Sequence, residues 1–178
     1  GRPSKKQQIL DTALSLFAEL GYQGTSIDLV VQRAGVSKPT VYNNFPTKLL
    51  LWQAALEQLV GQAEQRWEAL ATEIEGDALS RILHIFQALA EVPEWRAVYR
   101  IMLGEQHKMD EATRALFVDF EARLKHWCAT QLEGQGDEVS VTELFVLVAL
   151  CREGLLLPAL TGQPVAPQDE LRKVIECL

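Results

Sequence analysis

Apolar residues recur at helical spacing along almost the whole chain. In the segment 4–20 they repeat three to four positions apart, at Ile9, Ala13, Leu16, Phe17 and Leu20. Gly21 follows this run as a stop signal. Strand signals are nearly absent, because no stretch alternates apolar and polar residues cleanly and no Asn-Gly or Asp-Gly hairpin turn occurs. The pattern predicts an all-α chain whose first helix covers residues 4–20.

Capping residues and prolines predict where the later helices begin and end. A second short helix follows the cap oxygens of Thr25 and Ser26 and stops at Gly35. Ser37 caps a third helix, in which Pro39 is tolerated because first-turn amides lack an intrahelical partner. The remaining helices are predicted over residues 47–75, from 77 onward, from 93 onward, from 110 onward, over 140–157 and over 168–178.

The predicted helix 140–157 is apolar on nearly all sides. Such a helix is covered on more than one face, and we expect the protein's own core and a second subunit to cover it. The apolar stretch 144–160 is interrupted by Arg152, Glu153 and Pro158 and falls short of the roughly 20 clean residues of a bilayer span. It is therefore predicted to be a buried helix and not a membrane anchor.

Arg152 and Glu153 stand inside this apolar helix and need partners there. They could pair with neighbours in the core, pair across a dimer interface, or meet a polar group of a ligand. The sequence leaves these three alternatives open.

Composition and cysteine usage limit the class of protein. The chain has 178 residues, of which 48% are apolar and 23% charged, so it can bury a core and is neither disordered nor collagen-like. The three cysteines, Cys128, Cys151 and Cys177, show no CxxC or Cys/His spacing and are expected to be reduced thiols, without a metal or a cofactor. The amino end lacks the apolar region of a signal peptide, which favours a cytoplasmic protein.

Catalytic motifs are missing from the sequence. His84, His107 and His126 are scattered over predicted helices, and the acidic residues near His107 match no ligand spacing on one helical face. No glycine-rich phosphate loop, nucleophile elbow or HExxH motif occurs. We therefore predict that the chain is not an enzyme.

Charge divides the chain into two unlike parts. Residues 1–48 carry six basic and three acidic side chains, a net charge of +3. The remainder carries eleven basic and twenty-one acidic side chains, a net charge of −10. A basic segment joined to an acidic body favours nucleic acid as the partner of the first segment alone.

The two short helices around Gly35 have the pattern of a helix-turn-helix. On the third helix Val41 and Phe45 lie one turn apart and point inward, whereas Pro39 and Asn43 point outward. Thr40 and Tyr42 flank that outward face, and Lys38 stands at its start. Short polar side chains of this kind can approach base edges, where Asn pairs with adenine and Thr contacts a thymine methyl group.

The run TSIDLVVQRAGVSKPTVYNNFPTKLLL, residues 25–51, resembles the DNA-binding domain of the tetracycline-repressor (TetR) family of bacterial transcriptional regulators. The preceding LFAELGYQGTS supports the resemblance, which covers roughly residues 4–52. AGVSKPTVYNNFPTK is its specific part, because it joins the turn, the recognition helix and the next cap in one register. Leu29, Val31 and Leu49 depart from the residues usual in the family, and none of them belongs to the groove-facing set.

The resemblance implies a helix-turn-helix three-helix bundle over 1–48, joined by a long helix to a helical ligand-binding and dimerisation domain over 49–178. It implies that Ser26 holds a phosphate, that Tyr42 and Lys48 contact phosphates, and that the groove is faced by Ser37, Lys38, Pro39, Thr40, Tyr42 and Asn43. Tyr42 could instead cover the hinge to the next helix, and Lys48 could be an ordinary solvated lysine.

The resemblance also implies a homodimer formed by the last two helices and a small-molecule effector. The effector-binding candidates are Phe86, Tyr99, Met102, Phe120, Cys151 and Arg152, each of which could equally be a core residue. The expected function is repression from a palindromic double-stranded DNA operator, with release by the effector. The alternatives are an activator, an effector-independent regulator of the same fold, or a helical protein-interaction module.

Overall fold

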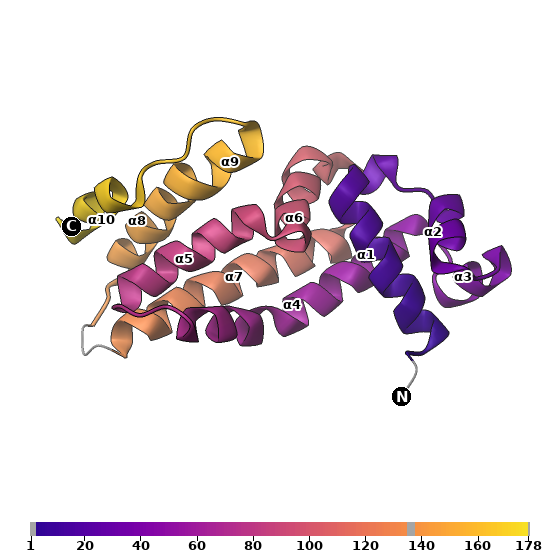
Figure 1. Ribbon diagram of the computed structural model, residues 1–178, viewed down its shortest axis with the longest axis horizontal. Coiled ribbons are helices and arrows are strands. Elements are labelled where there is room, and N and C mark those ends of the chain that lie inside the picture. Colours follow the sequence, from indigo (N-terminus) through magenta and orange to yellow (C-terminus); the bar gives the residue numbers. More distant parts are fainter. Residues whose placement is uncertain (1–2, 135–137, 178) are drawn as a thin grey trace. The chain divides into compact units, whose positions relative to one another are not determined.

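The computed structural model describes residues 3–134 and 138–177, and no strand occurs among them (Figure 1). The predicted all-α class is thereby confirmed. Leu178, the last residue of the final predicted helix, lies outside the described residues. The helices are α1 (Lys5–Gly24), α2 (Ile27–Ala34), α3 (Lys38–Asn44), α4 (Lys48–Thr72), α5 (Ala78–Glu91), α6 (Pro93–Gly104), α7 (Glu111–Glu133), α8 (Val141–Cys151), α9 (Leu157–Thr161) and α10 (Gln168–Glu176). Two short turns complete them, a 3₁₀ turn η1 (Gln106–Lys108) and a π turn η2 (Arg152–Leu156).

The helices begin at the residues that the capping pattern predicts. Ser26, and not Thr25, caps α2 by accepting the Leu29 N–H at 3.2 Å. The side chain of Asp77 accepts the Ser80 N–H at the start of α5 (2.9 Å). Ser140 and Glu143 form a reciprocal capping box at the start of α8. These side-chain caps satisfy first-turn amides that the helix itself leaves free.

The chain forms two compact units. The first unit contains the residues up to Gly61 and Pro93–Asp119, and the second contains Gln62–Val92 and the residues from Phe120 onward. In the first unit, α2 and α3 pack beside α1, and α6 contacts α1 as well (Figure 1). Phe17 of α1 lies at the centre of this core, with its ring edge-on to Trp52 at 5.1 Å and stacked on Tyr22.

Gly21 interrupts α1. Its backbone angles, φ 73° and ψ −175°, belong to a region that only glycine enters easily, so the regular helix breaks there. The predicted stop after Leu20 coincides with this break. The chain then makes one more turn to Gly24, which the sequence pattern did not predict.

The apolar helix predicted over 140–157 is divided, and much of it is exposed. The helical run continues through the π turn η2 to Thr161, because Pro158 sits in the first turn of α9. The expectation that this run is too short and too interrupted to span a membrane is wrong: by length and composition alone Val141–Thr161 could do so, with a mean hydropathy of 1.8 in its most apolar window of 18 residues. It is not a mostly buried core helix either, since only 28% of its most apolar window is buried.

Arg152 finds a partner inside the second unit. Its guanidinium forms an ion pair with the carboxylate of Glu121 on α7. Both side chains are largely shielded, with 30% and 19% of their surfaces exposed. The sequence left three kinds of partner open for Arg152, and the structure shows a partner within the same subunit.

A second ion pair predicts how stability depends on pH. The guanidinium of Arg172 and the Ser80 N–H both bond the Asp77 carboxylate and hold its pKa well below its ordinary value of 3.8. A carboxyl group whose pKa is depressed by folding stabilises the fold above its unfolded pKa, and this contribution is lost as the pH falls below about 4. Because the pair is partly exposed, we expect it to contribute less than about 1 kcal/mol.

Unfolding by urea between pH 3 and pH 7 checks this expectation. Asp77→Asn keeps an acceptor for the Ser80 N–H but removes the titrating group, so its stability should fall less steeply with acid than that of the wild type. Identical slopes for the two proteins would contradict the assignment.

Candidate DNA-binding site

The third helix presents one buried and one exposed face. Val41 is fully buried, and Phe45, the C-cap residue of α3, is 4% exposed. Both side chains therefore anchor α3 in the core of the first unit. Pro39, Tyr42 and Asn43 are exposed on the other face, and 41% of the Tyr42 surface is accessible. The inward and outward assignments made from the sequence are thereby confirmed for these five residues.

The turn between α2 and α3 is set by one glycine. Gly35 adopts φ 65° and ψ 33°, the left-handed conformation that glycine enters without strain, and its N–H bonds the Val31 carbonyl at 3.1 Å. Ser37 then caps α3 by accepting the Thr40 N–H at 3.3 Å. The Ser37 and Thr40 hydroxyls also share a hydrogen bond of 2.6 Å, so the two predicted groove-facing side chains lie side by side.

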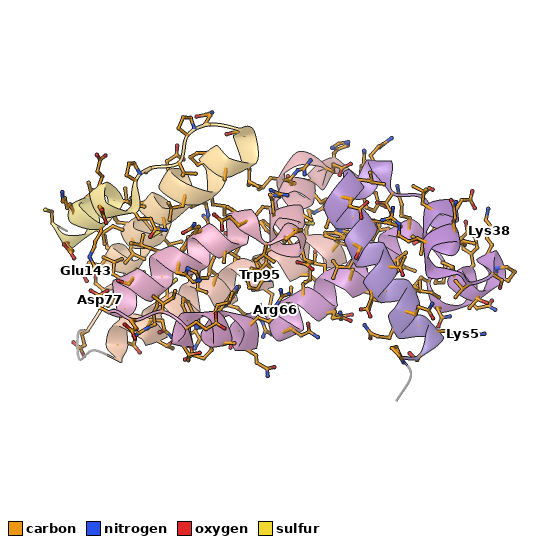
Figure 2. All side chains as sticks on the ribbon, in the orientation of Figure 1. Lys5, Lys38, Arg66, Asp77, Trp95 and Glu143 are labelled. Carbon is orange, nitrogen blue, oxygen red and sulfur yellow. The ribbon has the colours of Figure 1, made fainter. Side chains whose placement is uncertain are left out.

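Lys38 is held at the start of α3 by an acidic residue of α2. Its ammonium lies 2.8 Å from the Asp28 carboxylate, and both side chains are more than half exposed. The hydrogen bond and the charge of Asp28 raise the pKa of Lys38, so the lysine stays protonated at physiological pH. Figure 2 shows Lys38 projecting from α3 and Lys5 standing at the start of α1.

Lys48 has an intramolecular role besides its predicted phosphate contact. Its ammonium donates to the Tyr22 carbonyl at 2.9 Å and lies 4.3 Å from the centre of the Tyr22 ring. Burial lowers its pKa. An ammonium has three N–H donors, so this bond leaves donors for a phosphate, and the phosphate contact stays a prediction.

One lysine that the sequence-based set omits lies near α3, and a second precedes it in the chain. The Lys6 ammonium is 5.8 Å from the centre of the Phe45 ring, at the carboxyl end of α3, and Lys5 is exposed beside it in α1. Their signal in the sequence was the positive charge of residues 1–48, which showed a basic segment without showing which cations lie close to the recognition helix.

The residues predicted to bind an effector are distributed over both units. Phe86, Phe120 and Cys151 are fully buried in the second unit, where Phe120 meets the Trp67 ring at 5.4 Å. Tyr99 and Met102 are each 2% exposed in the first unit. Met102 also lines a cavity of about 240 Å³ with Gln106, Arg114 and Phe117. None of the six lines a second cavity, of about 260 Å³, formed in the second unit by α5, α9 and the loop before α10.

The thiols of Cys128 and Cys151 lie in the core. Burial raises the pKa of Cys151 to about 12, and it raises that of Cys128 further. Both thiols are therefore protonated and poorly nucleophilic at neutral pH.

Comparison with known proteins identifies the segment that holds α2 and α3. Residues 9–55 match the family described as bacterial regulatory proteins, tetR family. This segment therefore forms a tetR-family domain. The tetR match covers the turn, the recognition helix and the start of α4, which are the parts on which the resemblance in the sequence rested.

Individual relatives extend this result. The chain is 28% identical over 130 residues to the uncharacterized HTH-type transcriptional regulator YvkB of Bacillus subtilis (strain 168), covering 67% of this chain and 66% of YvkB. It is 39% identical over 57 residues to the HTH-type transcriptional regulator RutR of Escherichia coli (strain K12), covering 32% of this chain and 27% of RutR. These alignments thus span just under two thirds of one curated relative and about a quarter of the other.

A solved structure matches over nearly the whole chain. A transcriptional regulator from Saccharomonospora viridis, solved in complex with choline, superimposes with a TM-score of 0.71 and 25% identity, covering 97% of this chain and 93% of that one. The chain therefore shares the helical fold of this regulator beyond the segment that matches the tetR family.

Proposed function

We propose that the protein is a sequence-specific DNA-binding transcriptional regulator that reads the major groove with α3. The observation that carries this proposal is the exposed face of α3, where Pro39, Tyr42 and Asn43 stand free of acidic neighbours on the same helix, above an anchored Val41. Lys38 supplies a cation at its start. The match of residues 9–55 to the tetR family supports the assignment.

The proposed DNA contacts divide into two kinds. Thr40 and Asn43 reach base edges, and Ser37 and Pro39 pack along the groove. Ser26, Lys38, Tyr42 and Lys48 contact phosphates, joined by Lys5 and Lys6 on α1. Phosphate contacts position the protein on the duplex, whereas base contacts give it sequence preference.

The regulator is proposed to act as a homodimer through α8 and α10. Exposed apolar side chains on α8 support this: Phe145 is 65% exposed and Val141 is 87% exposed. Apolar surface of this kind is typical of an interface between subunits. Arg152, which follows α8 in the same helical run, and its partner Glu121 on α7 favour a protein partner over a lipid one, because charges in a bilayer are costly.

A dimer of this kind is proposed to repress transcription from a palindromic operator in the bacterial cytoplasm. A small organic effector would bind the helical body and release the DNA, and it could do so only by binding one conformation more tightly than the other. The choline complex of the Saccharomonospora viridis regulator supports a small-molecule ligand. Five of the six candidate effector residues, all but Arg152, are core residues in this conformation, so a ligand among them requires the core to open.

Selection from a pool of random-sequence duplexes tests the proposed function. The intact chain should enrich a palindromic sequence with half-sites about one helical turn apart, at salt concentrations that suppress non-specific binding. Failure to enrich any sequence, with the protein folded and dimeric, would contradict the proposal.

Substitution of Asn43 should change the kind of DNA that is selected. Asn43→Ala removes a hydrogen-bonding group from the base-facing side of α3, which is worth about 1–3 kcal/mol of discrimination at one base pair. Selection with the variant should give a consensus relaxed at one position in each half-site.

Lys38→Ala is the matched control, because it removes a phosphate contact from the same helix. It should weaken binding to all sequences alike and leave the consensus unchanged. An unchanged consensus for Asn43→Ala, or an altered one for Lys38→Ala, would contradict the assigned roles.

A further inference from the structure

A single carboxylate accepts hydrogen bonds from the backbone at the break in α1. Glu105 follows the last residue of α6, and its two oxygens accept the N–H groups of Tyr22 and Gln23, each at 2.9 Å. These N–H groups are available because Gly21 interrupts the hydrogen-bond ladder of α1 just before them. Glu105 therefore fills a backbone anion site within the first unit that the fold itself creates.

Two lysines form hydrogen bonds with the same dipeptide, Tyr22–Gln23. Lys108 of η1 lies 3.2 Å from the Glu105 carboxylate and also bonds the side-chain amide of Gln23. Lys48, near the start of α4, donates to the Tyr22 carbonyl. Tyr22 and Gln23 are thus bonded from α4 and from the segment after α6, at a point where their own helix is broken.

The Glu105 carboxylate lies against the backbone at Gly21. A Cβ atom at Gly21 would stand 3.4 Å from the nearer Glu105 oxygen, which is an ordinary van der Waals distance. Burial acts to raise the pKa of Glu105, but the two backbone N–H groups and Lys108 outweigh it and keep the pKa below its ordinary value. The site therefore stabilises the charged carboxylate of Glu105.

This dipeptide is joined directly to the helix-turn-helix. Thr25 donates its hydroxyl to the Gly21 carbonyl at 2.8 Å and its N–H to the Tyr22 carbonyl. Ser26, the cap of α2, is the next residue. The Glu105 site is therefore linked to the start of α2 through the hydrogen bonds of Tyr22, Gln23 and Thr25.

We infer that Glu105 is a positioning residue for DNA binding: its carboxylate couples the end of α6 to the end of α1 and thereby to α2 and α3. This inference rests on the proposed function. Release of the carboxylate frees the end of α1 and lowers the population of the DNA-competent arrangement, which lowers the apparent affinity for DNA. By linkage, DNA binding must in turn stabilise the end of α6.

Glu105→Gln tests the inference in the intact chain. Its amide oxygen can accept one N–H, but its NH₂ group then faces the other, and the charge for Lys108 is lost. Amide exchange at Tyr22 and Gln23 should accelerate at least about tenfold, and affinity for the duplex selected by the wild type should fall about three- to tenfold. Operator-induced protection of amides in α6, present in the wild type, should disappear.

Two further variants separate coupling from general destabilisation. Glu111→Gln makes the same chemical change at an exposed position in the first unit and should leave all three readouts unchanged. Glu105→Asp keeps the charge on a shorter side chain and should restore part of the protection and part of the affinity.

The outcomes distinguish the inference from the proposed function. Wild-type DNA affinity and α6 protection in a folded Glu105→Gln variant, or the absence of operator-induced α6 protection in the wild type, would overturn the coupling role. If the wild type selects no DNA at all, the proposed function fails, and the coupling role built on it fails with it, whatever the exchange at Tyr22 and Gln23.

Discussion

Phe145→Glu is expected to abolish the dimer and to lower operator affinity by at least about a hundredfold. Phe145 is 65% exposed on α8, within the apolar surface that we assign to the second subunit. A carboxylate there would have to be desolvated in both copies when they meet. A monomer binds one half-site, and the avidity that it loses is typically a factor of 10² or more.

Sedimentation equilibrium and gel shifts on the selected operator measure both effects. Val118→Glu is the control, because Val118 is 67% exposed on α7, in the first unit, where no subunit contact is proposed. It should remain dimeric and bind DNA normally. A dimeric Phe145→Glu variant with wild-type affinity would remove α8 from the proposed interface.

Gly21→Ala should lower the free energy of unfolding by about 1–3 kcal/mol. The backbone at Gly21 lies at φ 73° and ψ −175°, where any side chain brings strain of about this size. The added Cβ would stand 3.4 Å from a Glu105 oxygen, an ordinary van der Waals distance, so the expected loss comes from the backbone conformation. Urea unfolding of the variant measures the loss.

Gly61→Ala is the corresponding control in a regular helix. A Cβ at Gly61 meets no atom within 4 Å, and alanine is the better helix former, so this variant should gain up to about 1 kcal/mol. Equal effects of the two substitutions would contradict the strained backbone at Gly21.

Local signals in the sequence predicted most of the fold. The helix starts at Ser26, Ser37, Asp77 and Ser140 follow from side chains that bond amides three residues ahead, which is a short-range effect. The inward direction of Val41 and Phe45 follows from helical spacing alone. Such features depend on neighbours in the sequence and can be read from it directly.

The features that the sequence did not predict depend on contacts between distant residues. Glu105 lies more than eighty positions from Tyr22 and Gln23, and nothing in its own neighbourhood indicates a bond to α1. The same holds for Arg152, whose partner Glu121 belongs to another helix. The π turn that carries the apolar run past Pro158 likewise leaves no periodic signal.

The sequence predicted the DNA-binding residues and the effector-binding residues to different degrees. The α3 residues form a continuous motif, so their shared exposed face could be inferred from register. The six effector candidates were chosen by side-chain type, and type does not separate a pocket from a core. In this conformation five of them are almost fully buried, which is the arrangement that close packing produces.

Methylation interference on the selected operator tests the central claim most directly, because it reports which groove the protein occupies. Methyl groups at guanine N7 block the major groove, and those at adenine N3 block the minor groove. The account predicts that the intact chain is excluded by methylation of guanine N7 in two half-sites about one helical turn apart. Interference confined to the minor groove, or to a single site without symmetry, would contradict it.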